Sequence, residues 1–331
     1  MHRVLLVCHA TANIGLGHLS RLLSLAQALR KDGKIQPEFL IFGDHIEKDE
    51  LASFNTNFLP LSNDFVTSVK NHVEAHESDV VVFDLFPKKD FVIGLRDLFT
   101  LLSERNIRMI GVDSLLEHCD LLDLIWIPSF YFDISKYENC RCTLKSGWDS
   151  FLIQKRLPSR VWKKGLHVLV LTGGGDVTHL GNTLPAQLDA LLNEQSEIHW
   201  VRGPYAEAPS LPDKPRLNWN IHNAPTQLDE LIVQSDYVLT VFGVSFFEVL
   251  QYGIPTVVFS PYDNKDDHEL IALAEEGVAV VAENSDTAIL NLIKLMENED
   301  LAKACSDKAL EKLSVNGAQQ LSEAVCLMAG A

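Results

Sequence analysis

The chain has 331 residues, of which 47% are hydrophobic and 22% are charged, so it carries enough apolar surface to fold and wholesale disorder is excluded. At roughly 100–200 residues per domain, this length predicts two domains. The 28 Lys and Arg residues against 45 Asp and Glu give a formal net charge of −17, which repels nucleic-acid backbones and anionic lipid surfaces. A small phosphorylated ligand stays compatible, because backbone amides can hold phosphate without basic side chains.

The cysteines and apolar runs exclude several other classes of protein. The six cysteines form no CxxC pair, and the apolar run at 4–8 is too short for a secretory signal peptide. No run of 18 apolar residues occurs, so we expect no stable membrane insertion. The scattered histidines are not interpreted as a metal site. We therefore expect a cytoplasmic protein with no metal, no other cofactor and no nucleic-acid partner.

Short aliphatic runs recur along the first half, each followed by a loop and a helical pattern, which is typical of a parallel sheet covered by helices. The predicted strands are 3–8, 37–42, 79–83, 108–112 and 124–127. After the first strand, apolar residues from Leu19 to Leu29 recur at helical spacing and predict a helix that ends at the Asp32-Gly33 turn.

A basic stretch with a proline, 154–165, interrupts this pattern, and we place the domain boundary within it, giving domains 1–160 and 161–331. The second half resumes the alternation. Its predicted strands are 167–171, 198–202, 219–221, 237–240 and 256–259, with helices such as 183–192 and 245–252 between them. The fold class is therefore α/β, with two Rossmann-like domains built on parallel sheets.

Ligands of open α/β sheets bind beyond the carboxyl ends of the strands, so the loops that follow strands are the candidate sites. In the first such loop, Gly15 and Gly17 let a ligand approach the backbone, and the next helix directs free amides at an anion. His18 stands at the mouth of this loop, and Arg21, one helical turn further, is predicted with Gly15 and Gly17 to bind the ligand. Since Ser20 replaces the third glycine of the dinucleotide motif, NAD binding fits poorly. The alternative is an ordinary glycine turn with a capping histidine.

Two carboxylates also follow predicted strands: Asp84 after 79–83 and Asp113 after 108–112. Either one could orient His18 or act as a base if it is desolvated. Taken singly, each is better explained as the cap of a turn or helix, and the two gain weight only together with His18.

The second half carries two comparable loops. Gly173, Gly174 and Gly175 expose amides to a phosphate, and Asp176 after them either caps the next helix or contacts a sugar. Gly243, Val244 and Ser245 open another helix, where Glu248 could reach ribose hydroxyls. The alternatives are a structural tight turn and a glutamate that faces solvent.

The stretch 14–21 with Leu25-Ala26 resembles the GxGHxxR…LA opening of GT-B-fold nucleotide-sugar enzymes, especially the nucleotide-sugar hydrolase of the pseudaminic-acid pathway and predicted spore-coat-polysaccharide glycosyltransferases. It is more distantly similar to the peptidoglycan N-acetylglucosaminyltransferase. The similarity continues along most of the chain, through Asp84, Val112-Asp113, His118-Cys119-Asp120, Gly174-Gly175-Asp176, Gly243, Glu248 and Gly253-Ile254-Pro255.

This resemblance implies two domains that face each other across a cleft. The N-terminal domain would carry catalysis and the acceptor, and the C-terminal domain the nucleotide sugar. It also implies that no metal is obligatory, that His18 is catalytic and that Glu248 contacts the ribose. The sequence departs from the related enzymes at Phe242-Gly243, where they usually carry paired glycines.

The leading hypothesis is an inverting, metal-independent glycosyltransferase, in which His18 takes a proton from an acceptor hydroxyl and the glycine-loop amides stabilise the departing diphosphate. A UDP-sugar is the favoured donor and the acceptor is unknown. The first alternative is a nucleotide-sugar hydrolase that uses water at the same site. The second is a protein that binds a nucleotide sugar without turning it over.

Overall fold

The computed structural model describes residues 2–31, 33–88, 93–137, 139–262 and 266–331, which form two compact units. The first comprises Met1–Gln154 and Val315–Ala331, and the second Lys155–Ser314. The sequence analysis placed the division after residue 160 and kept the C-terminal residues with the second domain. The structure divides at residue 154 and not at 160 because Arg156 and Arg160 form ion pairs with Asp229 and Asp236 of the second unit.

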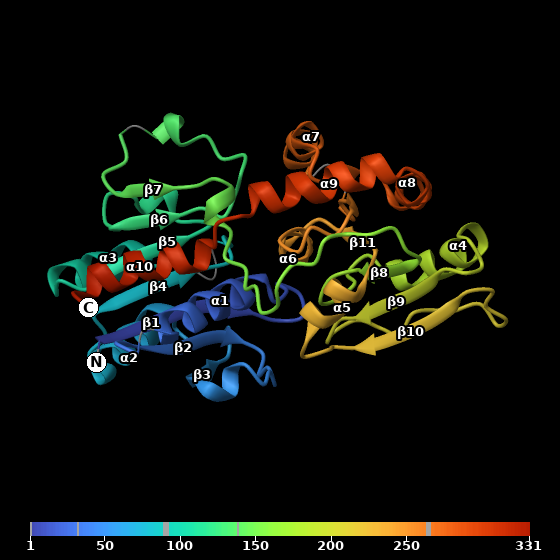
Figure 1. The fold of residues 1–331 in the computed structure, drawn as a ribbon. Coiled ribbons are helices and arrows are strands. Elements are labelled where there is room, and N and C mark those ends of the chain that lie inside the picture. The colour runs from blue at the N-terminus through green and yellow to red at the C-terminus, as the bar shows by residue number, and fades with distance from the viewer. Residues whose placement is uncertain (1, 32, 89–92, 138, 263–265) are drawn as a thin grey trace. The chain divides into compact units, whose positions relative to one another are not determined.

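The first unit is built on a seven-stranded parallel sheet with the order β3-β2-β1-β4-β5-β6-β7 (Figure 1). The strands are β1 (His2–Ala10), β2 (Ile35–Gly43), β3 (Asn55–Leu59), β4 (Val80–Asp84), β5 (Arg108–Val112), β6 (Leu124–Trp126) and β7 (Thr143–Lys145). The helices are α1 (Gly17–Lys31), α2 (Phe65–His76), α3 (Leu95–Glu104) and α10 (Gly317–Ala329).

The second unit has a six-stranded parallel sheet with the order β10-β9-β8-β11-β12-β13. The strands are β8 (His167–Leu171), β9 (Glu197–Arg202), β10 (Asn218–Asn223), β11 (Tyr237–Val241), β12 (Thr256–Phe259) and β13 (Val280–Val281). The helices are α4 (Leu184–Leu191), α5 (Leu228–Gln234), α6 (Val244–Leu250), α7 (Asp267–Glu276), α8 (Ser285–Glu297) and α9 (Glu299–Lys312). The predicted α/β class with two parallel sheets is confirmed.

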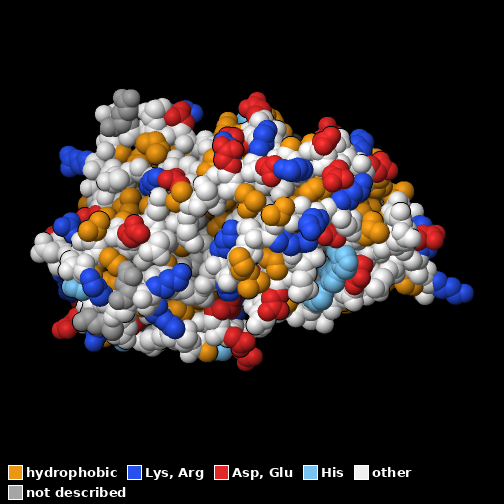
Figure 2. All heavy atoms as spheres, viewed as in Figure 1, with side chains coloured by type: hydrophobic (Ala, Val, Ile, Leu, Met, Phe, Trp, Pro, Cys, Tyr) orange, Lys and Arg blue, Asp and Glu red, His pale blue; other side chains and the backbone are white. Residues whose placement is uncertain are grey.

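Alternate residues of the first sheet pack against different helices, as the period of two in a strand requires. Leu6 of β1 and Val82 of β4 face a core shared with α1 and α10, whereas Val7 and Phe83 face α2 and α3. On the molecular face drawn in Figure 2, the hydrophobic side chains form separate small groups between polar and charged ones. Among the described residues, no helix combines the length and hydrophobicity needed to cross a membrane.

In each sheet, the order in which the chain adds strands reverses at one pair of central strands. In the first unit the chain leaves β1 for β2 and β3 on one side, then returns to β4 on the other. In the second unit, β8 and β11 are related in the same way. In open α/β sheets, the carboxyl ends of the strands at such a position are where ligands bind. The predicted glycine loops follow β1, β8 and β11, so they lie at these positions.

Candidate functional site

The first glycine loop forms a tight turn between β1 and α1. The Gly15 amide donates to the Thr11 carbonyl (2.8 Å), and Gly15 has φ 87°, a left-handed conformation that favours glycine. Because α1 begins at Gly17, His18 and Arg21 stand three residues apart on one helix face. Asp84 ends β4, the neighbour of β1, and Asp113 follows β5, the neighbour of β4.

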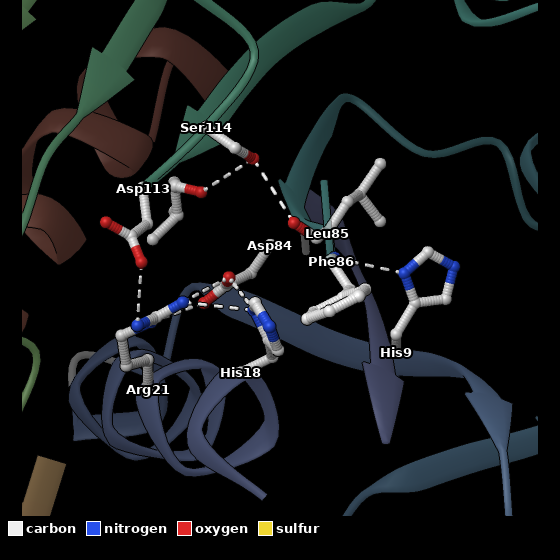
Figure 3. Close-up of polar contacts among 9 residues, drawn as sticks. His9, His18, Arg21, Asp84, Leu85, Phe86, Asp113 and Ser114 are labelled. Carbon is white, nitrogen blue, oxygen red and sulfur yellow. Dashed lines mark hydrogen bonds and ion pairs between the residues drawn. The ribbon is translucent and has the colours of Figure 1, made fainter. Parts of the chain in front are cut away.

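His18 and Asp84 form a short hydrogen bond, with 2.6 Å between Nδ1 and Oδ1 (Figure 3). A carboxylate only accepts, so Nδ1 of His18 carries the proton and donates. Nε2 is then the basic nitrogen of the ring. Asp84 is fully buried and the His18 side chain is mostly buried. The structure thus identifies Asp84, rather than Asp113, as the carboxylate bonded to His18.

Arg21 joins both carboxylates. Its Nε donates to Asp84 Oδ2 (2.8 Å), its Nη2 donates to Asp84 Oδ1 (2.7 Å), and its Nη1 lies 3.0 Å from Asp113 Oδ2. The sequence analysis grouped Arg21 with the ligand-binding residues, whereas all three of its nitrogens contact carboxylates of its own unit. Two carboxylates thus share one guanidinium.

The ion pair keeps Asp84 ionised in spite of its burial. Burial by itself raises the pKa of the Asp84 carboxyl, but the adjacent Arg21 guanidinium and the hydrogen bonds from Arg21 and His18 hold it below its usual value. Burial likewise opposes the charge of Arg21, yet Asp84 and Asp113 outweigh it and raise the pKa of the guanidinium. Asp84 is therefore a permanent acceptor for the His18 N–H at neutral pH.

His9 is a neighbour of this site that no sequence motif singled out. It lies near the end of β1, and its Nδ1 accepts from the Phe86 amide (3.1 Å). The Phe86 ring in turn meets the His18 ring edge to face, with 6.2 Å between centroids. Burial, together with the nearby His18, lowers the pKa of His9 to about 4. Its position at a strand end was the signal that could have found it.

The two glycine loops of the second unit lie on neighbouring strands. Leu171 of β8 is in register with Thr240 of β11, and a Cβ placed on Gly173 would lie 3.9 Å from Val241 Cγ2. A Cβ on Gly174 or on Gly243 would meet nothing within 4 Å, so open space borders both loops. Gly175 follows in the first loop, and the half-buried Val244 and Ser245 begin α6 after the second. The structure thus brings these predicted residues to one edge of the sheet.

The two acidic residues near these loops differ in environment. Asp176 is buried and accepts from the amides of Leu180 (3.0 Å) and Gly181 (2.8 Å), so it caps the short 3-10 helix Leu180–Asn182. This is the capping role that the sequence left open for Asp176. Glu248 is half-buried on α6, five residues after Gly243.

No protein-family model matches the sequence. The uncharacterized protein MJ1062 of Methanocaldococcus jannaschii is 26% identical over an alignment 325 residues long, and the alignment covers 87% of this chain. The matched part is 63% of that relative's length, so the chain spans less than two thirds of it.

Solved structures match almost the whole chain at low identity. MurG of Acinetobacter baumannii has a TM-score of 0.66 at 15% identity, covering 98% of this chain and 99% of its own. Phytolacca americana UGT2, complexed with UDP-2fluoro-glucose and pterostilbene, has a TM-score of 0.67 at 14% identity and coverages of 99% and 100%. S. aureus MnaA with UDP has a TM-score of 0.64 at 13% identity and coverages of 99% and 96%. The chain therefore has the GT-B fold.

Proposed function

We propose that the protein is a nucleotide-sugar enzyme that transfers a sugar, with inversion and without a metal, from a UDP-sugar to an acceptor hydroxyl. The observation that carries the proposal is the 2.6 Å hydrogen bond between His18 and the buried Asp84, at the carboxyl edge of the first sheet. This pair has the arrangement of a general base, with one ring nitrogen held by a carboxylate and the other basic.

In the proposed reaction, Nε2 of His18 removes the proton of the acceptor hydroxyl while its oxygen attacks the anomeric carbon. The bond between that carbon and the diphosphate oxygen breaks, and the nucleoside diphosphate leaves with the electron pair. The new glycosidic bond forms on the opposite face of the sugar, which inverts the configuration. Asp84 fixes the ring and balances the imidazolium, while Arg21 holds Asp84 in place.

The second unit supplies the proposed donor site. The amides at Gly173–Gly175 and Gly243–Ser245 would receive the diphosphate, and Glu248 would bind the ribose. The open space beside Gly174 and Gly243 supports this role. The printed descriptions of UGT2 and MnaA name a UDP-sugar analogue and UDP, which favours a uridine nucleotide. The proposal places the protein in the cytoplasm.

A donor panel tests this function. Purified protein is incubated with UDP-, GDP- and CMP-sugars, with and without candidate acceptors, and NMR follows nucleotide release and anomeric configuration. We expect UDP release that depends on the acceptor, together with an inverted product. Release of free sugar without any acceptor would instead identify a hydrolase. Nucleotide-induced thermal stabilisation without turnover would identify a binding protein. No stabilisation by any nucleotide and no turnover would overturn the proposal.

A further inference from the structure

We propose that Glu38, His72 and His76 form a binding site for one divalent transition-metal ion of the zinc type, which fastens the end of α2 to β2. The sequence analysis expected no metal, yet His72 and His76 stand four residues apart on α2. This spacing places two imidazoles on one helix face, one turn apart. Their rings stack with 4.2 Å between centroids.

Glu38 faces these rings from β2. Its Oε2 lies 3.5 Å from His72 Nε2 and 3.1 Å from His76 Nδ1. Zinc binds imidazole nitrogen and carboxylate oxygen at about 2.0–2.2 Å, so ligand atoms in a tetrahedral site lie about 3.3–3.5 Å apart. The 3.5 Å separation therefore matches an edge of such a site, and the 3.1 Å separation is slightly shorter than one. The rings are nearly parallel, at 13°, so both would rotate about their Cβ–Cγ bonds to aim at one ion.

The burial of this cluster leaves a polar group that needs explanation. The side chains of Glu38 and His72 are only 6% and 9% exposed. Among the described residues, His72 Nε2 has no hydrogen-bond partner, although it faces the carboxylate. Burying a ring nitrogen without a hydrogen-bond partner raises the free energy of the folded protein unless an ion or a water molecule binds it.

The location of the cluster indicates a structural role. Glu38 pairs with Leu5 in the first half of β1, and Arg3 at the start of β1 donates to the His76 carbonyl (2.6 Å). The cluster therefore lies toward the amino end of the sheet, whereas His18 and Asp84 lie at the carboxyl end. His76, 33% exposed, gives a path for the ion from solvent.

A second group, His167, Glu197 and His199 on β8 and β9, provides an internal comparison. It is more exposed, and its members are already engaged. His199 Nδ1 lies 3.1 Å from His222 Nε2, and Asn220 donates to Glu197 Oε1 (2.6 Å). The buried Glu38 cluster is therefore the stronger metal site, and His199 is the position for a control variant.

The test uses the full chain after treatment with a chelator, titrated with zinc chloride. Bound zinc is measured by equilibrium dialysis with elemental analysis, and the thermal midpoint by calorimetry. The variants are Glu38→Gln and His76→Asn, with His199→Asn as the matched control. We expect one zinc per chain and a midpoint raised by about 5–10 °C at about 100 times Kd. Both effects should disappear in the two variants and persist in His199→Asn.

Cobalt provides a readout that needs no variant. Co²⁺ bound to wild-type protein in place of zinc should give the visible absorption of a four-coordinate ion with nitrogen and oxygen ligands, so poor folding of a variant would not hide the answer. The proposal is overturned if wild-type protein binds no stoichiometric zinc, or if His199→Asn alone removes it. These measurements need no enzymatic turnover, so their failure is distinguishable from failure of the proposed function.

Discussion

Asp84 receives two hydrogen bonds from Arg21 and one from His18 in a fully buried position. Replacing Arg21 with Met leaves this charge without its cation. We expect Arg21→Met to lower the free energy of unfolding by about 3–5 kcal/mol, the usual effect of breaking a buried ion pair. Urea denaturation followed by circular dichroism measures the change.

The double variant Arg21→Met with Asp84→Asn separates charge burial from lost packing. Because the second substitution removes the stranded charge, it should restore most of the stability lost by the first, giving a strongly non-additive cycle. Additive losses would show that Arg21 acts through its contacts with other groups.

His18→Ala removes the proposed base together with the whole of its mostly buried ring. We expect kcat to fall about 10²–10⁴-fold while the Kd for the nucleotide stays unchanged, since the proposed donor loops lie in the other unit. The matched control is His268→Ala, at an exposed position on α7. Turnover close to wild type in a folded His18→Ala protein would exclude the proposed base.

His9 predicts a pH dependence of stability. Its pKa is about 4 in the folded protein against an ordinary value of 6.5, so the unfolded chain binds more protons between these values. The contribution of the neutral ring is present above pH 6.5 and is lost as the pH falls toward 4, by up to about 3 kcal/mol. Denaturant unfolding at pH 5 and 7 should show a smaller decrease in His9→Gln than in wild type. Equal decreases would contradict this assignment.

At the scale of loops and strands, Gly174 offers a clean test of the donor site. An alanine Cβ there meets no atom within 4 Å, and the backbone is outside the left-handed region. We expect Gly174→Ala to leave the thermal midpoint unchanged and to weaken UDP binding about tenfold or more, because the methyl group would displace the diphosphate. Isothermal titration measures the affinity.

Gly203→Ala is the contrasting variant. A Cβ at Gly203 would lie 2.3 Å from the Gly174 carbonyl oxygen, so this substitution should disturb the folded loop itself. Unchanged UDP affinity in Gly174→Ala would show that the diphosphate does not approach this backbone.

The central strands were predictable because they are buried on both sides. Strands such as β4 and β8 appear as aliphatic runs bounded by polar residues, and the structure confirms them. The strands β3, β7 and β13, each at an edge of its sheet, escaped prediction, whereas the edge strand β10 was predicted as 219–221. An edge strand needs less apolar sequence, as the half-buried Asn55–Leu59 shows.

The candidate site was predictable in part for the same reason. His18, Asp84 and Asp113 all follow central strands, so their convergence could be expected from strand order. The bond from His18 to Asp84 and the engagement of Arg21 depend on side-chain rotamers that spacing does not fix. Glu38 was missed because a carboxylate inside a strand does not indicate a metal site by itself. Its neighbours His72 and His76 lie on α2, and only the structure shows that α2 packs beside this part of β2.

At the scale of the whole molecule, α10 belongs to the first unit. Its Ala318, Leu321 and Val325 are buried in the core shared with α1. The sequence shows that this helix has an apolar face, but not which sheet that face covers, so its assignment needed the structure.

Leu321→Ala tests this assignment. We expect it to destabilise the first unit by about 2–5 kcal/mol through a cavity next to α1. Hydrogen exchange should then quicken at β1 and β4 while β8 and β11 keep their protection. Faster exchange confined to the second unit would contradict the placement of α10.

The return of residues 315–331 to the first unit also affects the order of biosynthesis. During translation, most of the first unit is synthesised early, but its core lacks α10 until residues 315–331 are made. The second unit is one continuous segment, residues 155–314. The later-translated unit can thus complete its core first. A recombinant 155–314 fragment retains every element of its sheet, whereas a 1–154 fragment would expose the apolar surface that α10 covers.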